Sequence, residues 1–437
     1  MRGELFTATY SFAAIGLIKF GSSVITTRIL YPEAYGIVSM IAAIAFVLDM
    51  MSDLGAMTLM VRHEKAEEPA YINTAWTLRL IRGCINATLL LLLAPWLADF
   101  YGAPELAPAL RLYSVCFVID GLESMAFMLA IRRQRSSLFN LCELFAVTVT
   151  TAMSIGLALL LRNHYAIVIG MIVHRLLMTS LSHCFYREHR PRIQIDRAAA
   201  ADLFQITKFV LPSSIVTLLM TQYDKGVFLK FFDLRQLGLY GLALNIIQIV
   251  DGRLVRLART VLFPRCAEAF RRDPGSLAHH YYQGSVRFHA LILAVPAGVG
   301  GLAPLLVEVA FDHRYHEAGF ILQAFSVRSV LVALASSSEA VLLAIGHVHM
   351  GLIGNVLRLA WVVPASLLGY MAGGFDGFVI GVASEPLGAL IAYLVVQRRS
   401  HLLSFRYEGF RFAYAAAVFA TAFEMAQLGQ RIMLTSH

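Results

Sequence analysis

The stretch "TTRILYPEAYGIVSM", residues 26–40, indicates an internal repeat, because a turn of the same kind occurs again later in the chain. A short polar turn at Pro32 interrupts two long apolar runs. The same kind of turn recurs as "FFDLRQLGLYGLAL", residues 231–244, where Gly241 takes the place of Gly36. Glycine permits a tight entry into the following helix, and proline suits its first turn. The repeated turn predicts that the fold consists of two similar halves.

The composition indicates a membrane protein. The 437 residues are 58% hydrophobic and 15% charged, with a mean hydropathy of +0.67, whereas a soluble domain carries about 25% charged residues. The apolar residues form runs of about 20, which as helices cross roughly 30 Å of hydrocarbon. Because a helix satisfies its own backbone in lipid, we expect an all-α polytopic membrane protein. The five scattered cysteines form no metal or disulfide pattern, and no cofactor is expected.

The apolar runs predict twelve membrane helices. Their expected spans are 5–29, 33–59, 73–98, 105–131, 138–161, 164–186, 203–230, 236–263, 287–311, 317–345, 349–371 and 375–397. A thirteenth run, 412–433, contains Glu424 and Gln427, so it either crosses the membrane or lies at its surface.

Lysine and arginine set the expected orientation. They gather in alternate connections, whereas the other connections hold only Arg162, Arg235 and Arg314. Because cytoplasmic loops carry the excess of Lys and Arg, the bias predicts a cytoplasmic N-terminus. This inner belt accounts for most of the net charge of +8. Contact with membrane lipids explains it, and nucleic-acid binding is not expected.

A second pair of corners supports an internal repeat. "DFYGAPELAPALRL", residues 99–112, follows the third helix, and "AFDHRYHEAGFILQ", residues 310–323, follows the ninth. Two six-helix lobes in the same orientation make a parallel pseudo-repeat, with substrate carried between them. The predicted parts are an N-lobe, a cytoplasmic connector, a C-lobe, and a basic segment with a weak C-terminal helix: 1–186, 187–202, 203–397 and 398–437.

Several stretches carry a family resemblance. They are "TRILYPEAYGIVSM", the third helix with "NTAWTLRLIRG", "FYGAPEL" before the fourth helix, and "AIRRQRSSLFN" at residues 130–140. In this order and spacing the chain resembles the polysaccharide-biosynthesis flippases (Wzx-like) of the multidrug/oligosaccharidyl-lipid/polysaccharide superfamily. The resemblance implies the two-lobe fold that the superfamily's drug exporters share. It is clear over the first four helices.

The resemblance implies a transporter and not an enzyme. Such proteins carry undecaprenyl-pyrophosphate-linked oligosaccharide from the cytoplasmic to the periplasmic leaflet of the bacterial inner membrane, for exopolysaccharide or lipopolysaccharide export. Polysaccharide polymerase and export proteins are then further expected partners.

Two other functions stay open. A cation-coupled multidrug exporter of the same superfamily would need an acidic, aromatic cavity, and a membrane glycosyl-polymerase or ligase would present its catalytic residues on a long outer loop. The charges near mid-depth lean basic, and no predicted outer connection exceeds a short turn.

Cations inside predicted membrane helices are candidates for binding a pyrophosphate. A charge near the bilayer centre costs at least about 2.5–3.5 kcal/mol, so it tends to face a cavity or a partner. Arg253 and Arg256 belong to "DGRLVRLAR", residues 251–259, where they and Arg259 form an i, i+3, i+6 stripe. Arginine forks bind phosphate oxygens in pairs. In relatives the first, second, seventh and eighth helices line the cavity, so the predicted substrate-binding residues are Lys19, Arg253 and Arg256, followed by Arg79 and Arg82.

Each of these cations has an alternative role, as an interhelical ion pair or an anchor at the inner lipid surface. Four carboxylates are candidates for coupling or gating. Asp49 and Asp53 are four residues apart and are expected to share one helical face. Asp224 and Asp251 lie on the predicted seventh and eighth helices.

Overall fold

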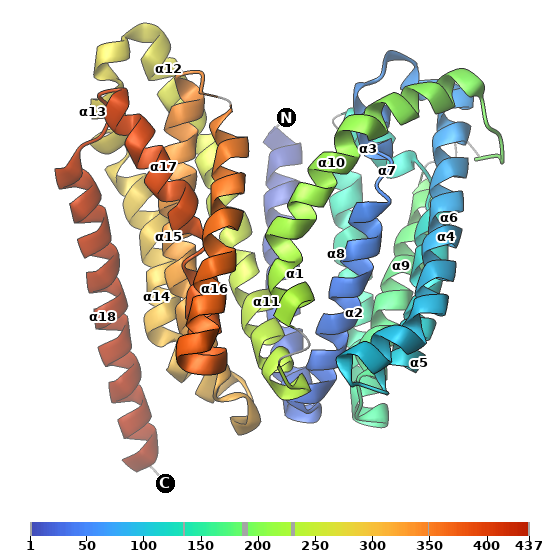
Figure 1. Ribbon diagram of the computed structural model, residues 1–437, viewed down its shortest axis with the longest axis horizontal. Coiled ribbons are helices and arrows are strands. Elements are labelled where there is room, and N and C mark those ends of the chain that lie inside the picture. Colours follow the sequence, from blue (N-terminus) through green and yellow to red (C-terminus); the bar gives the residue numbers. More distant parts are fainter. Residues whose placement is uncertain (1, 134–135, 186–190, 229–231, 348, 436–437) are drawn as a thin grey trace. The chain divides into compact units, whose positions relative to one another are not determined.

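The computed structural model shows an all-helical chain (Figure 1) and describes residues 2–133, 136–185, 191–228, 232–347 and 349–435. It divides into two compact units, Met1–Gly238 and Leu239–His437. Seven described helices are long and apolar enough to cross a membrane, or eight if a bent pair counts as one span. The lobe boundaries that the sequence predicts stay a prediction.

The first unit packs its long helices against one another, α1 against α8, α8 against α9, and α2 against α10. The shorter α6 packs against α4. The helices are α1 (Arg2–Ile29), α2 (Pro32–Met51), α3 (Ala56–Arg62), α4 (Pro69–Tyr101), α5 (Leu106–Tyr113), α6 (Val115–Leu122), α7 (Ala126–Arg132), α8 (Ser136–Leu161), α9 (Tyr165–Phe185) and α10 (Arg197–Phe228).

In the second unit α14 packs against both α15 and α18. Its helices, the first of which starts within the first unit, are α11 (Leu234–Leu257), α12 (Phe263–Arg272), α13 (Leu277–Tyr282), α14 (Val286–Ala310), α15 (Ala318–Ala344), α16 (Met350–Ala383), α17 (Pro386–Arg399) and α18 (Phe405–Thr435). The predicted weak helix 412–433 is thus part of a long helix, and its crossing of the membrane stays a prediction.

Two predicted spans are wrong in detail. The second span, expected over 33–59, ends as a helix at Met51. Gly55, the residue directly before α3, adopts a left-handed φ of 70°, so the chain does not continue as one helix. The fourth span, expected over 105–131, is three short helices with a 53° bend before Ala126. The Ser124 hydroxyl accepts a hydrogen bond from the Ala126 amide at 3.3 Å, next to this bend.

The predicted turn between spans 349–371 and 375–397 is confirmed. Gly373 and Gly374 break α16, and the φ of Gly374 is 58° with ψ −135°, a conformation that favours glycine. The two arms then pack closely, because Gly369 and Gly377 each lie against the carbonyl group of the other.

The two corners that resemble each other also touch. α2 begins at Pro32 and α11 begins at Leu234, so Gly238 lies as many residues into its helix as Gly36 does. A Cβ on Gly36 would overlap the Leu234 carbonyl, and one on Gly238 would overlap the Pro32 carbonyl. Glycine at both positions permits this reciprocal approach.

The connecting segment before α10 is fastened to α4. The predicted connector 187–202 starts outside the described residues, and it becomes helical at Arg197. In the described part before Arg197, the backbone amides of Arg192, Gln194 and Asp196 donate hydrogen bonds to side chains of α4, at 3.0, 3.1 and 2.9 Å. The acceptors are Asn73 Oδ1, Thr77 Oγ1 and Thr74 Oγ1. The "NT" of the third-helix motif therefore anchors this segment.

Candidate functional site

The first unit holds a cluster of buried charges on α4 and α6. Arg79 Nη2 lies 2.7 Å from Glu123 Oε2 and 3.2 Å from Asp120 Oδ2. Arg79 is a residue of α4, Asp120 a residue of α6, and Glu123 follows α6 directly. The side chains are only 12% to 19% exposed, so the pairs are largely shielded from solvent.

Two further helices join this cluster. Arg175 of α9 places Nη1 3.1 Å from the second oxygen of Asp120. Arg82, one turn after Arg79, donates to Asp49 of α2 at 2.8 Å. Three arginines thus meet three carboxylates, and the ion pairs connect α2, α4, α6 and α9. A cluster of this kind clamps helices together, and its arginines are already occupied.

A second cluster lies in the second unit and is centred on Arg328 of α15. Arg328 Nη1 donates to Asp251 of α11 at 2.8 Å, and Nη2 donates to Glu385 at 2.7 Å. The Ser329 hydroxyl also donates to Asp251. Arg358 of α16 places Nε 3.1 Å from the other oxygen of Glu385. Two arginines meet two carboxylates, so this cluster is neutral as well.

The predicted substrate-binding residues separate into two groups. Arg79 and Arg82 are engaged in ion pairs, as the alternative reading of these arginines expected. Lys19 on α1, and Arg253 and Arg256 on α11, are exposed. Lys19 forms no ion pair among the side chains that the structure describes. The arginines and carboxylates of the two clusters balance, so these clusters add no net charge.

The predicted basic stripe of α11 crosses a change of helix type before Arg259. α11 ends at Leu257, and Ala258–Leu262 form a π-helical turn. Arg259 is therefore a residue of this turn. It lies 3.8 Å from Glu339 of α15.

The predicted shared face of Asp49 and Asp53 is also wrong. Asp53 lies beyond the end of α2, where Oδ1 accepts a hydrogen bond from the Gly55 amide at 2.9 Å. Its other oxygen accepts one from the Ser214 hydroxyl of α10 at 3.1 Å. Asp53 therefore shapes the break between α2 and α3. The side chain of Asp224 lies outside those that the structure describes.

One buried polar group was not anticipated from the sequence. Arg411 of α18, 5% exposed, donates to Glu408 at 2.8 Å and to the Tyr281 hydroxyl at 3.1 Å. Its guanidinium carbon lies 4.6 Å from the ring centre of Tyr281 and 4.7 Å from that of Tyr282. Burial raises the pKa of Tyr282, which lies outside the apolar helices. The sequence features that could have indicated this site are the adjacent Tyr281 and Tyr282 and the basic segment that contains Arg411.

Comparison with known proteins identifies the chain. The model of the family described as "Polysaccharide biosynthesis protein" matches residues 25–319. The chain belongs to this family.

This polysaccharide biosynthesis protein has curated relatives of low identity. It is 22% identical to the lipopolysaccharide biosynthesis protein WzxC of Escherichia coli (strain K12), over 89% of the chain and 78% of the relative. It is 23% identical to the succinoglycan biosynthesis transport protein ExoT of Rhizobium meliloti (strain 1021), over 66% of the chain and 56% of the relative. It is therefore a membrane transport protein of polysaccharide biosynthesis.

Solved structures share the fold. The inward closed conformation of the lipid II flippase MurJ matches with a TM-score of 0.72 and 11% identity, over 99% of this chain and all of that one. An inward-facing multidrug resistance transporter of the MATE family matches with a TM-score of 0.66 and 16% identity, over 89% and 94%. The polysaccharide biosynthesis protein thus has the multi-span helical fold of the MATE and MurJ transporters.

Proposed function

We propose that this protein is a flippase that moves undecaprenyl-pyrophosphate-linked oligosaccharide from the cytoplasmic to the periplasmic leaflet. Family membership and the relatives named for lipopolysaccharide and succinoglycan biosynthesis support a sugar-polymer substrate. The predicted orientation puts the N-terminus of α1 in the cytoplasm. Alternating access between two lobes is the proposed mechanism, with the polyprenyl tail remaining in the bilayer.

The proposal rests on three exposed cations of α1 and α11, whereas the arginines of the two clusters are largely buried. Arg79, Arg82 and Arg328 neutralise buried carboxylates, so they serve the rigidity of each helical unit. Lys19, Arg253 and Arg256 are exposed on α1 and α11. A pyrophosphate needs several donors, and arginine forks can each supply two. We assign the pyrophosphate to these three residues.

The paired aspartates take a different role in the proposal. Asp49 binds Arg82 and Asp251 binds Arg328, each across two helices of one unit. These pairs hold the helices of each unit together. A coupling role would require that a proton or cation compete with an arginine for the carboxylate, which disfavours Asp49 and Asp251 as cation sites.

Complementation of polymer export in a deletion strain tests the assignment. Arg256→Ala removes a charge-assisted contact worth about 1.5–3 kcal/mol, which is about 10- to 150-fold in affinity. Arg256→Lys keeps the charge without the fork, so intermediate export is expected. Lys19→Ala should also reduce export. Arg399→Ala, an exposed arginine at the end of α17, is the matched control. Full export by both alanine variants at normal protein level would contradict the assignment.

A further inference from the structure

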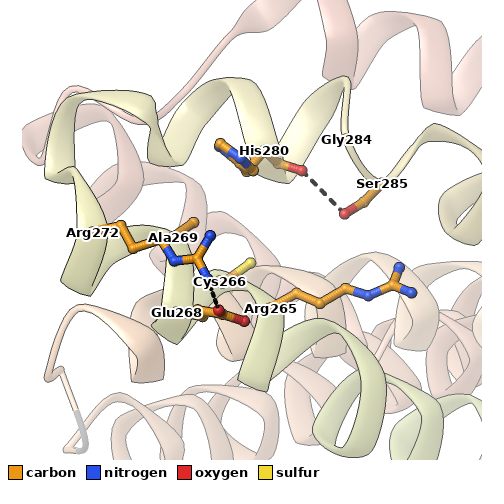
Figure 2. Close-up of a pocket in the computed structure, with 8 residues that line it drawn as sticks. All are labelled: Arg265, Cys266, Glu268, Ala269, Arg272, His280, Gly284 and Ser285. Carbon is orange, nitrogen blue, oxygen red and sulfur yellow. Dashed lines mark hydrogen bonds and ion pairs between the residues drawn. The ribbon is translucent and has the colours of Figure 1, made fainter.

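A hollow lined by basic side chains lies in the second unit, in the segment between α11 and α14. Its volume is about 230 Å³. The lining residues are Arg265, Cys266, Glu268, Ala269, Arg272, His280, Gly284 and Ser285. Figure 2 shows the side chains of α12 on one side, with His280 and Ser285 on the other. The sequence predicts this segment, 264–286, as a cytoplasmic loop, but the structure makes it two helices and a turn.

The hollow has a firm base. Cys266, Ala269, Leu277 and Tyr281 belong to one buried apolar cluster that joins α12 and α13. The connection behind the hollow is tight, because a Cβ on Gly284 would approach the His280 carbonyl oxygen to 2.9 Å. The two walls are therefore fixed to each other by packing, and the hollow belongs to the fold of this segment.

The walls present more positive than negative charge. Glu268 is the one carboxylate among the lining residues, and Arg272 Nη2 holds it at 2.6 Å. Arg265 is exposed and forms no ion pair among the side chains that the structure describes. His280 Nδ1 donates to the Ser276 carbonyl at 3.0 Å, so its Nε2 can donate only when the ring is protonated. The lining thus carries two arginines and one carboxylate, a net charge of +1 with His280 neutral.

We propose that this hollow binds a phosphate group, with Arg265 and Arg272 as the donors. A planar guanidinium matches phosphate oxygens with two hydrogen bonds, and two such forks suit one anion. The side chain of Arg272 is 79% exposed and that of Glu268 is 54% exposed, so their ion pair contributes little to stability. Arg272 can therefore turn toward a ligand at a small cost in free energy. The excess of positive charge disfavours a cation, and the mixed polar lining disfavours a purely apolar ligand.

The phosphate can belong to an anionic lipid headgroup or to a soluble phosphate compound. The segment directly follows the π-helical turn at the end of α11, on the side that the Lys/Arg bias predicts to be cytoplasmic. Basic pockets on this side of membrane proteins bind anionic headgroups. The site is separate from Lys19, Arg253 and Arg256, so it does not depend on the proposed transport substrate.

The test uses the full-length protein and two kinds of probe. Inorganic pyrophosphate, titrated against protein in neutral detergent, probes a soluble source. Nanodiscs that contain phosphatidylglycerol, compared with phosphatidylcholine and analysed by native mass spectrometry, probe a lipid source. The variant is Arg265→Ala/Arg272→Ala. The matched control is Arg271→Ala/Arg399→Ala, which removes the same charge from two exposed arginines that do not line the hollow.

We expect at least one probe to bind, and the Arg265→Ala/Arg272→Ala variant to weaken it by about 10-fold or more, while the control variant keeps wild-type affinity. Arg265→Lys/Arg272→Lys should fall between them. Unchanged binding by the alanine variant, equal loss in the control variant, or no binding of either probe would overturn the proposal. Thermal unfolding of each variant shows that the fold is retained.

Discussion

Removing Arg328 should destabilise the protein strongly, because this one side chain holds two buried carboxylates. Asp251 is 15% exposed and Glu385 is 7% exposed, and Arg328 lies 2.8 and 2.7 Å from them. In Arg328→Met, Asp251 keeps the Ser329 hydroxyl and Glu385 keeps Arg358 as side-chain partners within the part of the chain that the structure describes. Removing one partner of a buried ion pair typically costs about 3–5 kcal/mol, since it leaves an uncompensated charge.

The assay is the free energy of unfolding from denaturant titration in detergent. Arg328→Met should lower it by about 3–5 kcal/mol. Arg328→Met/Asp251→Asn should recover part of that loss, because the orphaned charge is removed, and Arg399→Met should change it by less than about 0.5 kcal/mol, as is usual at a surface position. A single variant as stable as wild type, or a double variant less stable than the single one, would refute the clamp role of Arg328.

Three other changes test the fold. Gly36→Ala should cost about 1–3 kcal/mol of stability through overlap with the Leu234 carbonyl. Gly21→Ala should not lower the stability in this way, because no atom lies within 4 Å of its added Cβ. Equal melting temperatures of the Gly36→Ala and Gly21→Ala variants would contradict the close approach at Gly36. Cys266 should resist maleimide at pH 7.5, because burial raises the pKa of its thiol to about 12; rapid labelling of the native protein would show that the base of the hollow is open. Asn73→Ala/Thr77→Val should speed hydrogen exchange at the Arg192 and Gln194 amides, and unchanged exchange would mean that α4 does not anchor this segment.

Apolar runs and glycine predicted most of the helices. The sequence predicts a turn between the spans 349–371 and 375–397, and the structure places it at Gly373 and Gly374. The end of α2 was missed, because Gly55 lies within an apolar pattern that continues into α3. The π-helical turn at Ala258–Leu262 was missed as well, since hydrophobic spacing does not distinguish one π turn from an α turn.

The sequence predicted which charged residues lie inside the helices, but it did not predict which of them form ion pairs. The cost of a charge in lipid pointed to Arg79, Arg82 and Asp251. Their partners could not be read from the sequence, because Glu123 meets Arg79 and Arg328 meets Asp251 across different helices. Ion pairs of this kind depend on how helices pack. The structure shows which arginines are buried in the two clusters and which are exposed, and residue spacing alone does not show this.

Flipping by the purified protein in proteoliposomes would show whether it carries a lipid-linked sugar between leaflets. The vesicles would contain undecaprenyl-pyrophosphate-linked oligosaccharide, and a membrane-impermeant glycosidase would report which sugars are exposed outside. We predict protein-dependent transfer that is reduced about 10-fold or more by Lys19→Ala or Arg256→Ala and kept by Arg399→Ala. Vesicles that export a cationic dye while leaving the lipid-linked sugar in its original leaflet would contradict the account and favour a drug exporter.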